Sequence, residues 1–138
     1  MSDELFSTMA ISASGMQAQG KRLRIVSENL ANANSTAETP DGLPYRRQVV
    51  TFRNELDREL GVNRVSVDRV TLDDSEFQRR YDPAHPSADD EGYVLYPNVS
   101  TLVEVMDMRE AQRSYEANMN VIQQSKSMMM STIDLLRS

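Results

Sequence analysis

The single histidine of the chain is the first place to look for chemistry. It is His85, in the stretch Tyr81-Asp-Pro-Ala-His-Pro86, and its carboxylate neighbours Asp82, Asp89 and Asp90 could serve as metal ligands or orient a general base. A hydrolytic metal site usually has about three protein ligands, and this sequence has neither a second histidine nor a nucleophile beside the first. The two prolines favour a rigid, solvated acidic turn. We therefore expect no catalytic residue, no metal and no cofactor.

Composition bounds the remaining possibilities. The chain has 138 residues, enough for one ordinary domain, but 39% are hydrophobic, 6% are aromatic and none is tryptophan, which predicts a thin core. The formal charge of -6 gives little support for a phosphate-binding surface, so nucleic acid is not an expected partner. The absence of cysteine excludes disulfides, thiolate chemistry and cysteine-ligated metals.

The first residues, Met-Ser-Asp-Glu-Leu-Phe, are acidic and are not followed by an apolar signal-peptide core. No run of about 18 apolar residues is present to span a membrane. We expect no cleavable secretory signal and no direct membrane insertion. If the protein leaves the cytoplasm, it must use another route.

The last third of the chain has the most regular pattern. Apolar residues recur every seven positions, with further ones four residues later on the same helical face, which predicts a long helix with one apolar stripe. At 1.5 Å per residue, such a helix spans about 54 Å and needs a partner along its length. The stripe comprises Met108, Tyr115, Met119, Ile122, Met129, Ile133 and Leu136.

The start of this helix is marked by capping residues. Asn98, Ser100 and Thr101 offer side-chain oxygens to the free N–H groups of a first turn, just after Pro97. Thr101 and Glu104 also have the spacing of a capping box.

A second helical pattern runs from about Asp3 to Asn32. Small residues between Ala10 and Gly20 reduce helix propensity but allow another helix to come close. Ser12 and Gln19 stand where a strict heptad would have apolar residues, so an ordinary amphipathic helix pair remains an alternative to a coiled coil. The stripe on this helix comprises Leu5, Met9, Ala13, Met16, Leu23, Val26 and Leu30.

Between the helices, the period changes. The segment 31–42 is expected to be a connector. Asn29 and Asn32, three residues apart at the end of the first helix, are expected to cap it locally in preference to a binding role. Segments 45–52, 65–72 and 77–81 have β-strand character, and the spacing of Phe52, Leu56 and Leu60 suggests a short helix.

Several motifs in fixed order resemble those of one known family. The stretches 13–19, 23–32 and 44–47 resemble the N-terminal signature of bacterial flagellar axial proteins, and 107–118 resembles their C-terminal signature. The short length, together with 81–86, 92–94 and 97–99, is similar to the proximal rod subunits of the basal body, the rod protein C type. Two positions depart mildly from that family. Many of its members have Asn where this chain has Ser100, and Met is common where it has Val105.

The resemblance implies an α+β fold, in which long N- and C-terminal helices pair as an antiparallel coiled coil and a small β domain is inserted between them. The implied divisions are an N-terminal axial helix (1–36), a connector with a β domain (37–97) and a C-terminal axial helix (98–138). The implied function is that of a structural subunit that polymerises through its terminal helices into the tubular rod that transmits motor torque.

Partners and location follow from the same resemblance. The implied partners are other rod proteins and copies of the chain in a helical assembly, membrane-ring and rod-base adaptor proteins, and the flagellar type III export apparatus. The implied location is the periplasmic rod of the flagellar basal body, reached without a cleaved signal peptide. The residues expected at the assembly interface are Met9, Met16, Leu23, Val26, Asn29, Leu30, Asn32, Met108, Tyr115, Asn118, Met119, Ile122, Met129, Ile133 and Leu136.

Two other classes of function remain open. Heptads alone would also fit a soluble coiled-coil adaptor or an export chaperone. The second class is a periplasmic hydrolase that uses His85, because a rod must cross peptidoglycan and a hydrolase could open it.

Overall fold

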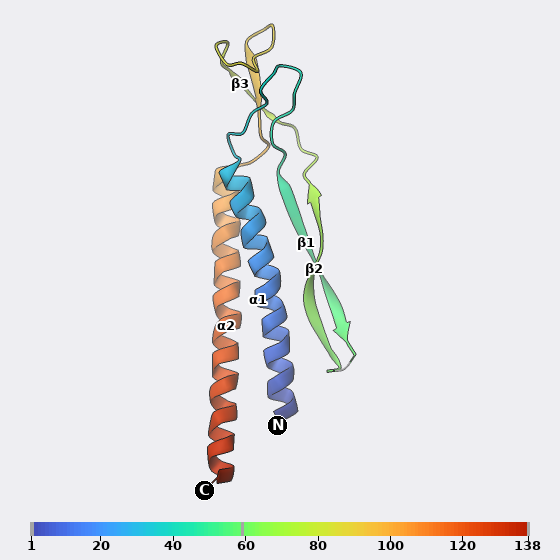
Figure 1. Ribbon diagram of the computed structural model, residues 1–138, viewed down its shortest axis with the longest axis vertical. Helices are drawn as coiled ribbons and strands as arrows, with labels where there is room; N and C mark the ends of the chain where they lie inside the picture. Colours follow the sequence, from blue (N-terminus) through green and yellow to red (C-terminus); the bar gives the residue numbers. More distant parts are fainter. Residues whose placement is uncertain (1, 59, 138) are drawn as a thin grey trace. The chain divides into compact units, whose positions relative to one another are not determined.

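The computed structural model describes residues 2–58 and 60–137, and two long helices account for about half of them (Figure 1). The helices are α1 (Ser2–Ala31) and α2 (Thr101–Arg137). Between them lie the strands β1 (Gln48–Asp57), β2 (Val62–Leu72), β3 (Gln78–Tyr81) and β4 (Tyr93–Tyr96). β1 pairs with β2, and β3 pairs with β4 in antiparallel fashion. The predicted α+β class with two long terminal helices is confirmed.

The chain forms two compact units, and each takes part of both helices and of both long strands. Unit 1 contains Met1–Leu23, Thr51–Arg69 and Arg109–Ser138, whereas unit 2 contains Arg24–Val50 and Val70–Met108. Unit 1 carries 10 basic and 9 acidic residues, but unit 2 carries 5 basic and 12 acidic residues. Unit 2 therefore has a formal charge of -7, and unit 1 is close to neutral.

In unit 1, α1 lies between α2 and the β1–β2 ribbon (Figure 1). The Ser14 hydroxyl accepts a hydrogen bond from the backbone N–H of Val65 on β2, at 3.1 Å. An ion pair of 3.5 Å joins Arg22 to Glu110, while Gly15 faces Asn118 further along α2. Residue numbers fall along α2 as they rise along α1, so the two helices are antiparallel.

Small and polar side chains form the contact between the helices of unit 1. The most buried positions are Ser12 and Ala18 on α1 and Ala111 and Ser125 on α2, none of them more than 5% exposed. A Cβ atom added at Gly15 would lie 2.8 Å from the side-chain nitrogen of Asn118. The close approach expected from the small residues is therefore present at Gly15.

In unit 2, β4 contributes the fully buried Val94, which pairs with Arg80 on β3. Guanidinium groups stack on aromatic rings at the surface, with Arg80 4.3 Å from the Tyr96 ring centre and Arg79 4.6 Å from that of Tyr93. Gly92 has a φ of 87°, and its added Cβ would meet the Tyr81 ring at 2.9 Å. The turn before β4 therefore requires glycine for both conformation and space.

Two details of the sequence prediction were wrong. Phe52 and Leu56 do not belong to a helix, because β1 continues through them to Asp57 and pairs with β2. The described residues between Phe52 and Leu60 form a strand followed by a turn, and Gly61 after them adopts a φ of 66°. The four-residue spacing of the apolar residues is thus incidental. In addition, β4 was not predicted.

Candidate assembly surface

A buried asparagine connects four segments within unit 2. The Asn29 side chain is 1% exposed, and its oxygen accepts hydrogen bonds from the Tyr45 hydroxyl at 2.7 Å and the Gln48 backbone N–H at 3.0 Å. Its nitrogen donates to the Gln48 carbonyl at 2.9 Å and to Glu104 at 3.2 Å. All four hydrogen-bonding positions of the amide are used. Asn29 thus has a structural role within the chain, whereas Asn32 makes the local contact with the Glu28 carbonyl that was expected of a helix cap.

Glu104 is fully buried and is neutralised by Arg47. The Arg47 guanidinium donates a hydrogen bond to the Glu104 carboxylate and also lies 3.2 Å from Asp73 and 3.6 Å from Asp107. Burial alone would lower the pKa of Arg47, but its hydrogen bonds and attraction to Glu104 and Asp73 raise it above the ordinary value. A buried carboxylate with this many partners is costly to disturb. We call Asn29, Tyr45, Arg47, Asp73 and Glu104 the polar junction.

Besides Arg47, two further members of the polar junction have shifted pKa values. Burial, followed by the negative charges of Glu28 and Glu104, raises the pKa of Tyr45. Hydrogen bonds from the backbone and side chain of Ser75, with a smaller contribution from Arg47, hold the pKa of Asp73 below 3.8.

The residues expected to cap α2 have other roles. The Asn98 oxygen accepts a hydrogen bond from the Arg47 backbone N–H at 2.8 Å, and its nitrogen donates to the Asp73 carbonyl at 3.1 Å. The Glu104 carboxylate points to Asn29 and Arg47. The predicted capping box is therefore wrong, because the buried guanidinium is a stronger partner for this carboxylate than a backbone N–H at an exposed helix end.

His85 holds its own loop together. Its Nδ1 atom is 2.8 Å from the Ser87 hydroxyl and accepts from the Ser87 N–H at 3.0 Å, and its Nε2 atom is 3.1 Å from the Thr36 hydroxyl. Asp89 caps the following turn by accepting hydrogen bonds from two backbone N–H groups. Within residues 2–58 and 60–137, no group of three or more His, Asp or Glu side chains could hold a metal ion.

The fifteen residues expected at an assembly interface differ in exposure. Val26 is 5% exposed and Asn29 1%, so both contact the chain itself, whereas Ile133 is 47% exposed and Leu136 82%. The remaining eleven are half-buried: Met9, Met16, Leu23, Leu30, Asn32, Met108, Tyr115, Asn118, Met119, Ile122 and Met129.

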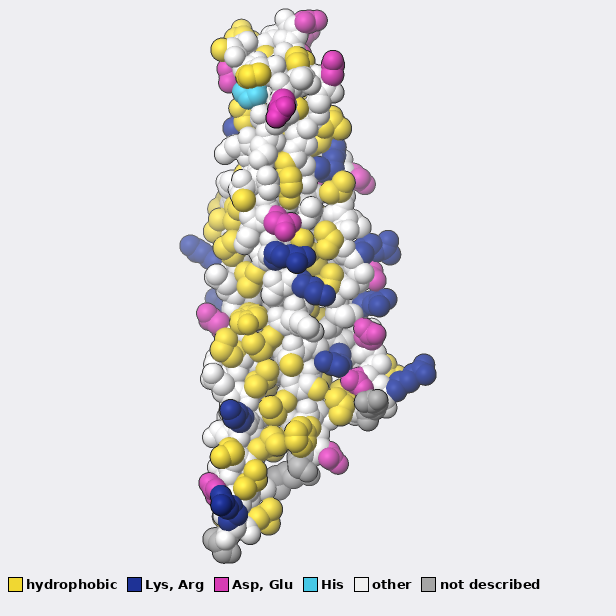
Figure 2. All heavy atoms as spheres, viewed as in Figure 1, with side chains coloured by type: hydrophobic (Ala, Val, Ile, Leu, Met, Phe, Trp, Pro, Cys, Tyr) yellow, Lys and Arg dark blue, Asp and Glu magenta, His cyan; other side chains and the backbone are white. Residues whose placement is uncertain are grey.

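A second apolar stripe on α2 was missed by the sequence analysis. Val121 is 38% exposed and Met128 51%, and both lie outside the contact with α1. Figure 2 shows hydrophobic side chains recurring along the visible face as far as the C-terminal end of α2. The sequence does contain a signal for this stripe, because Val121 and Met128 are seven residues apart and each stands one position before Ile122 or Met129.

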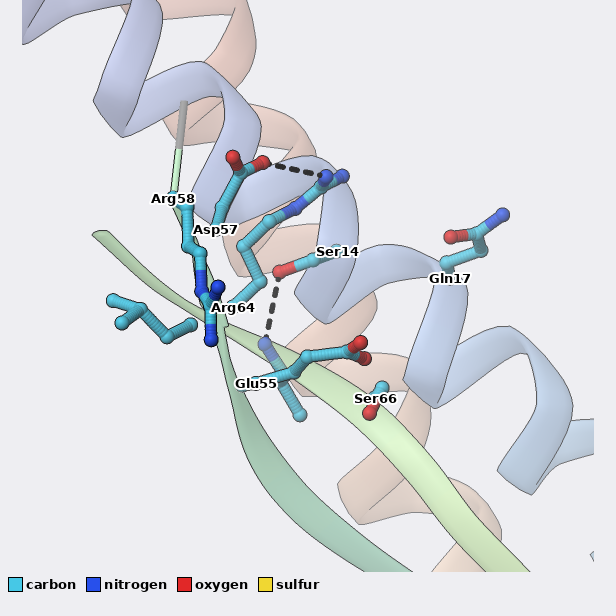
Figure 3. Close-up of a pocket in the computed structure, with 9 residues that line it drawn as sticks. Ser14, Gln17, Glu55, Asp57, Arg58, Arg64 and Ser66 are labelled. Atoms are coloured by element: carbon cyan, nitrogen blue, oxygen red, sulfur yellow. Dashed lines mark hydrogen bonds and ion pairs between the residues drawn. The ribbon is translucent and has the colours of Figure 1, made fainter. Parts of the chain in front are cut away.

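A groove of about 500 Å³ lies in unit 1 between α1 and the β1–β2 ribbon (Figure 3). Its charged groups are of both signs, and Asp57 pairs with Arg64 at 3.1 Å across it. Ser14 lies at its wall and binds the backbone of β2. The groove thus has mixed polarity, with one ion pair between its own charged residues. Over the described part of the chain, no helix is both long and apolar enough to pass through a membrane.

Comparisons with known proteins agree with this architecture. The family model described as flagella basal body rod protein matches residues 9–37, and the one described as flagellar basal body rod FlgEFG protein C-terminal matches residues 90–135. The flagellar basal-body rod protein FlgC of Agrobacterium fabrum is 52% identical over 136 residues, covering 99% of this chain and 98% of its own.

More distant relatives cover the same length. FlgC of Borreliella burgdorferi is 40% identical, with 96% of this chain and 98% of the relative covered. FlgC of Salmonella typhimurium is 38% identical, with 95% and 97% covered. Because these matches extend over nearly the whole of each protein, the chain belongs to the FlgC family of flagellar basal-body rod proteins.

Proposed function

We propose that this chain is a subunit of the proximal rod and polymerises through its terminal helices into the tubular shaft that transmits motor torque. The observation that carries the proposal is the near full-length similarity to rod proteins of three distant bacteria. As a member of that family, the chain is a structural component of the flagellar basal body and not an enzyme. The hydrolase and adaptor hypotheses are therefore not retained.

The arrangement of the helices supports polymerisation. Many of their apolar side chains are only half-buried or exposed, as expected of a subunit whose neighbours complete its core. In this proposal, segments 1–36 and 98–138 are the axial helices, and 37–97 forms the outer part. The fifteen residues expected at the assembly interface either contact neighbours directly or hold the helix pair in the form that neighbours bind.

The family resemblance also suggests the partners. We propose that the chain contacts other rod proteins and copies of itself, and meets membrane-ring and rod-base adaptor proteins at the ends of its layer. It reaches the periplasm through the flagellar type III export apparatus without signal cleavage.

Complementation tests this function. A deletion of the corresponding Agrobacterium fabrum gene, supplied with this chain, should regain motility, and the chain should co-purify with basal bodies. Leu23→Asp and Ile122→Asp should abolish motility while export persists, because a buried charge disrupts the helix seam. Gln123→Asp, at an exposed position, is the matched control and should remain motile. Two results would contradict the proposal. One is that the Asp variants are not exported although any exported copies are incorporated normally, and the other is that the unmodified chain never enters basal bodies.

A further inference from the structure

The second stripe on α2 has the spacing of a helix-packing seam. Its members alternate by four and three residues, as apolar positions of a coiled coil do, and none is charged. The residues that follow the first four members are half-buried or buried, and one of them, Asn118, faces Gly15 on α1. The stripe is therefore rotated by about 100° around the helix from that face. All are exposed in unit 1. We call them the outer stripe: Ala117, Val121, Gln124, Met128 and Ser131.

Gly20 on α1 supplies a matching surface. A glycine within a helix costs stability relative to alanine, and the chain itself gives no reason for this one. Among the described residues, no atom lies within 4 Å of an added Cβ at Gly20, although the same addition at Gly15 would meet Asn118 at 2.8 Å. Gly20 is half-buried, and Ala13, seven residues before it, is exposed. This face of α1 therefore has room for the closely approaching side chains of another helix.

The charge distribution favours contact between two copies through unit 1. Unit 1 contains 10 basic and 9 acidic residues, and unit 2 has an excess of 7 acidic residues. Two copies that meet through unit 1 bring together nearly neutral surfaces, whereas two copies that met through unit 2 would bring together surfaces of the same negative charge, which repel most strongly at low salt.

We propose that the outer stripe of one copy docks on the Ala13 and Gly20 face of α1 in a second copy. Val121 and Met128 then fill the space beside Gly20, where Met adapts to an irregular surface. The two faces differ in sequence, so the contact is not self-complementary and repeats from copy to copy instead of closing as a dimer. This inference rests on the proposed rod assembly and names one copy-to-copy contact within it.

Disulfide cross-linking in cells tests the contact, because the natural chain has no cysteine. Gly20→Cys and Met128→Cys variants carry different tags and are produced together in the Agrobacterium fabrum deletion strain, followed by mild oxidation. A cross-linked product containing both tags is expected in purified basal bodies. Gln123→Cys, exposed on another face of α2, replaces Met128→Cys in the matched control and should give at least fivefold less product.

A chain with both cysteines separates a repeating contact from a closed one. It should give a ladder of products larger than a dimer, whereas a product that stops at the dimer would overturn the heterologous contact. Motile cells whose basal bodies contain the cysteine variants but give no more product than the control would overturn the docking and leave the rod function intact. Failure of the unmodified chain to enter basal bodies would instead overturn the proposed function.

Gly20→Leu supplies a measurement that does not depend on oxidation. Because the space beside Gly20 is open, the purified variant should keep the helical circular dichroism and melting temperature of the unmodified chain, or exceed that temperature. Its incorporation into basal bodies should fall at least tenfold. Normal incorporation would show that no helix packs closely at Gly20.

Discussion

Asn29, near the end of α1, and Glu104, in the first turn of α2, share a 3.2 Å hydrogen bond across 75 residues of sequence. Both side chains are buried, at 1% and 0% exposure. Arg47 supplies the compensating charge. Because both long helices and the connector contribute to the polar junction, it fixes where one helix ends beside the start of the other. Interactions of this kind specify helix register in other proteins.

Removal of the Glu104 carboxylate should destabilise the protein strongly. Glu104→Ala leaves the Asn29 amide and the Arg47 guanidinium with a lost partner, and we expect a loss of about 3–5 kcal/mol in the free energy of unfolding. Urea unfolding followed by circular dichroism measures it. Glu110→Ala is the control, because Glu110 is 69% exposed in its pair with Arg22, and an exposed pair contributes about 1 kcal/mol or less. Equal losses in the two variants would contradict this role of Glu104.

The two glycines of α1 should respond differently to the same substitution. Gly20→Ala should stabilise the protein by about 0.5–1 kcal/mol, since helix propensity improves and no contact is disturbed. Gly15→Ala should lack this gain, because the new methyl group meets Asn118, whose amide also donates to the Ser114 carbonyl at 2.9 Å. Melting temperatures compared side by side test the difference. A higher melting temperature for Gly15→Ala than for Gly20→Ala would show that α2 does not press against Gly15.

Asp73 should make stability depend on pH in the acid range. Its pKa is lower in the folded chain than the ordinary value of 3.8, so its contribution is fully present above that value and is lost as the pH falls through the folded pKa. Unfolding free energies at pH 7 and pH 3 should therefore differ less in Asp73→Asn than in the unmodified chain, by about 1 kcal/mol or less because Asp73 is partly exposed. The neighbouring Asp74→Asn is the control. An unchanged pH dependence in Asp73→Asn would count against the hydrogen bonds from Ser75.

Hydrogen exchange on the purified monomer should divide each helix in two. The polar junction lies in unit 2, so backbone amides in 24–31 and 101–108 should exchange more slowly than those in 2–23 and 109–137, whose contact contains mostly small side chains. Mass spectrometry of peptides from quenched samples resolves these segments. Uniform, slow exchange along both helices would mean that the helix pair of unit 1 is as stable as unit 2 before assembly.

The sequence located the helices well because their apolar residues recur over many turns. Met108, Tyr115, Ile122 and Met129 are half-buried, but the more deeply buried positions between them are Ala111 and Ser125. In a pattern of polar and apolar residues, a buried serine cannot be distinguished from a serine that faces solvent. The tight helix contact therefore could not be predicted beyond the general expectation from small residues such as Gly15.

The polar junction could not be predicted because its residues also fit simpler roles. Glu104 has capping-box spacing, and Asn29 stands near a helix end, so local hydrogen bonds were the economical interpretation. Only the folded chain shows that Tyr45 reaches Asn29 and that Arg47 reaches Glu104. Likewise, β1 was predicted too short, because pairing with β2 carries the strand through residues of low β propensity to Asp57.

The four hydrogen bonds of Asn29 also affect what can be removed from the chain. A fragment that lacks both terminal helices would retain Tyr45, Arg47 and Gln48 but lose the amide and the carboxylate that they bind. The Tyr45 hydroxyl and the Gln48 backbone groups would lose these partners, and Arg47 would keep only Asp73 of its three carboxylate partners. The middle of this protein is therefore not a module that evolution or an experimenter can move freely, since its folding depends on residues at the inner ends of both helices.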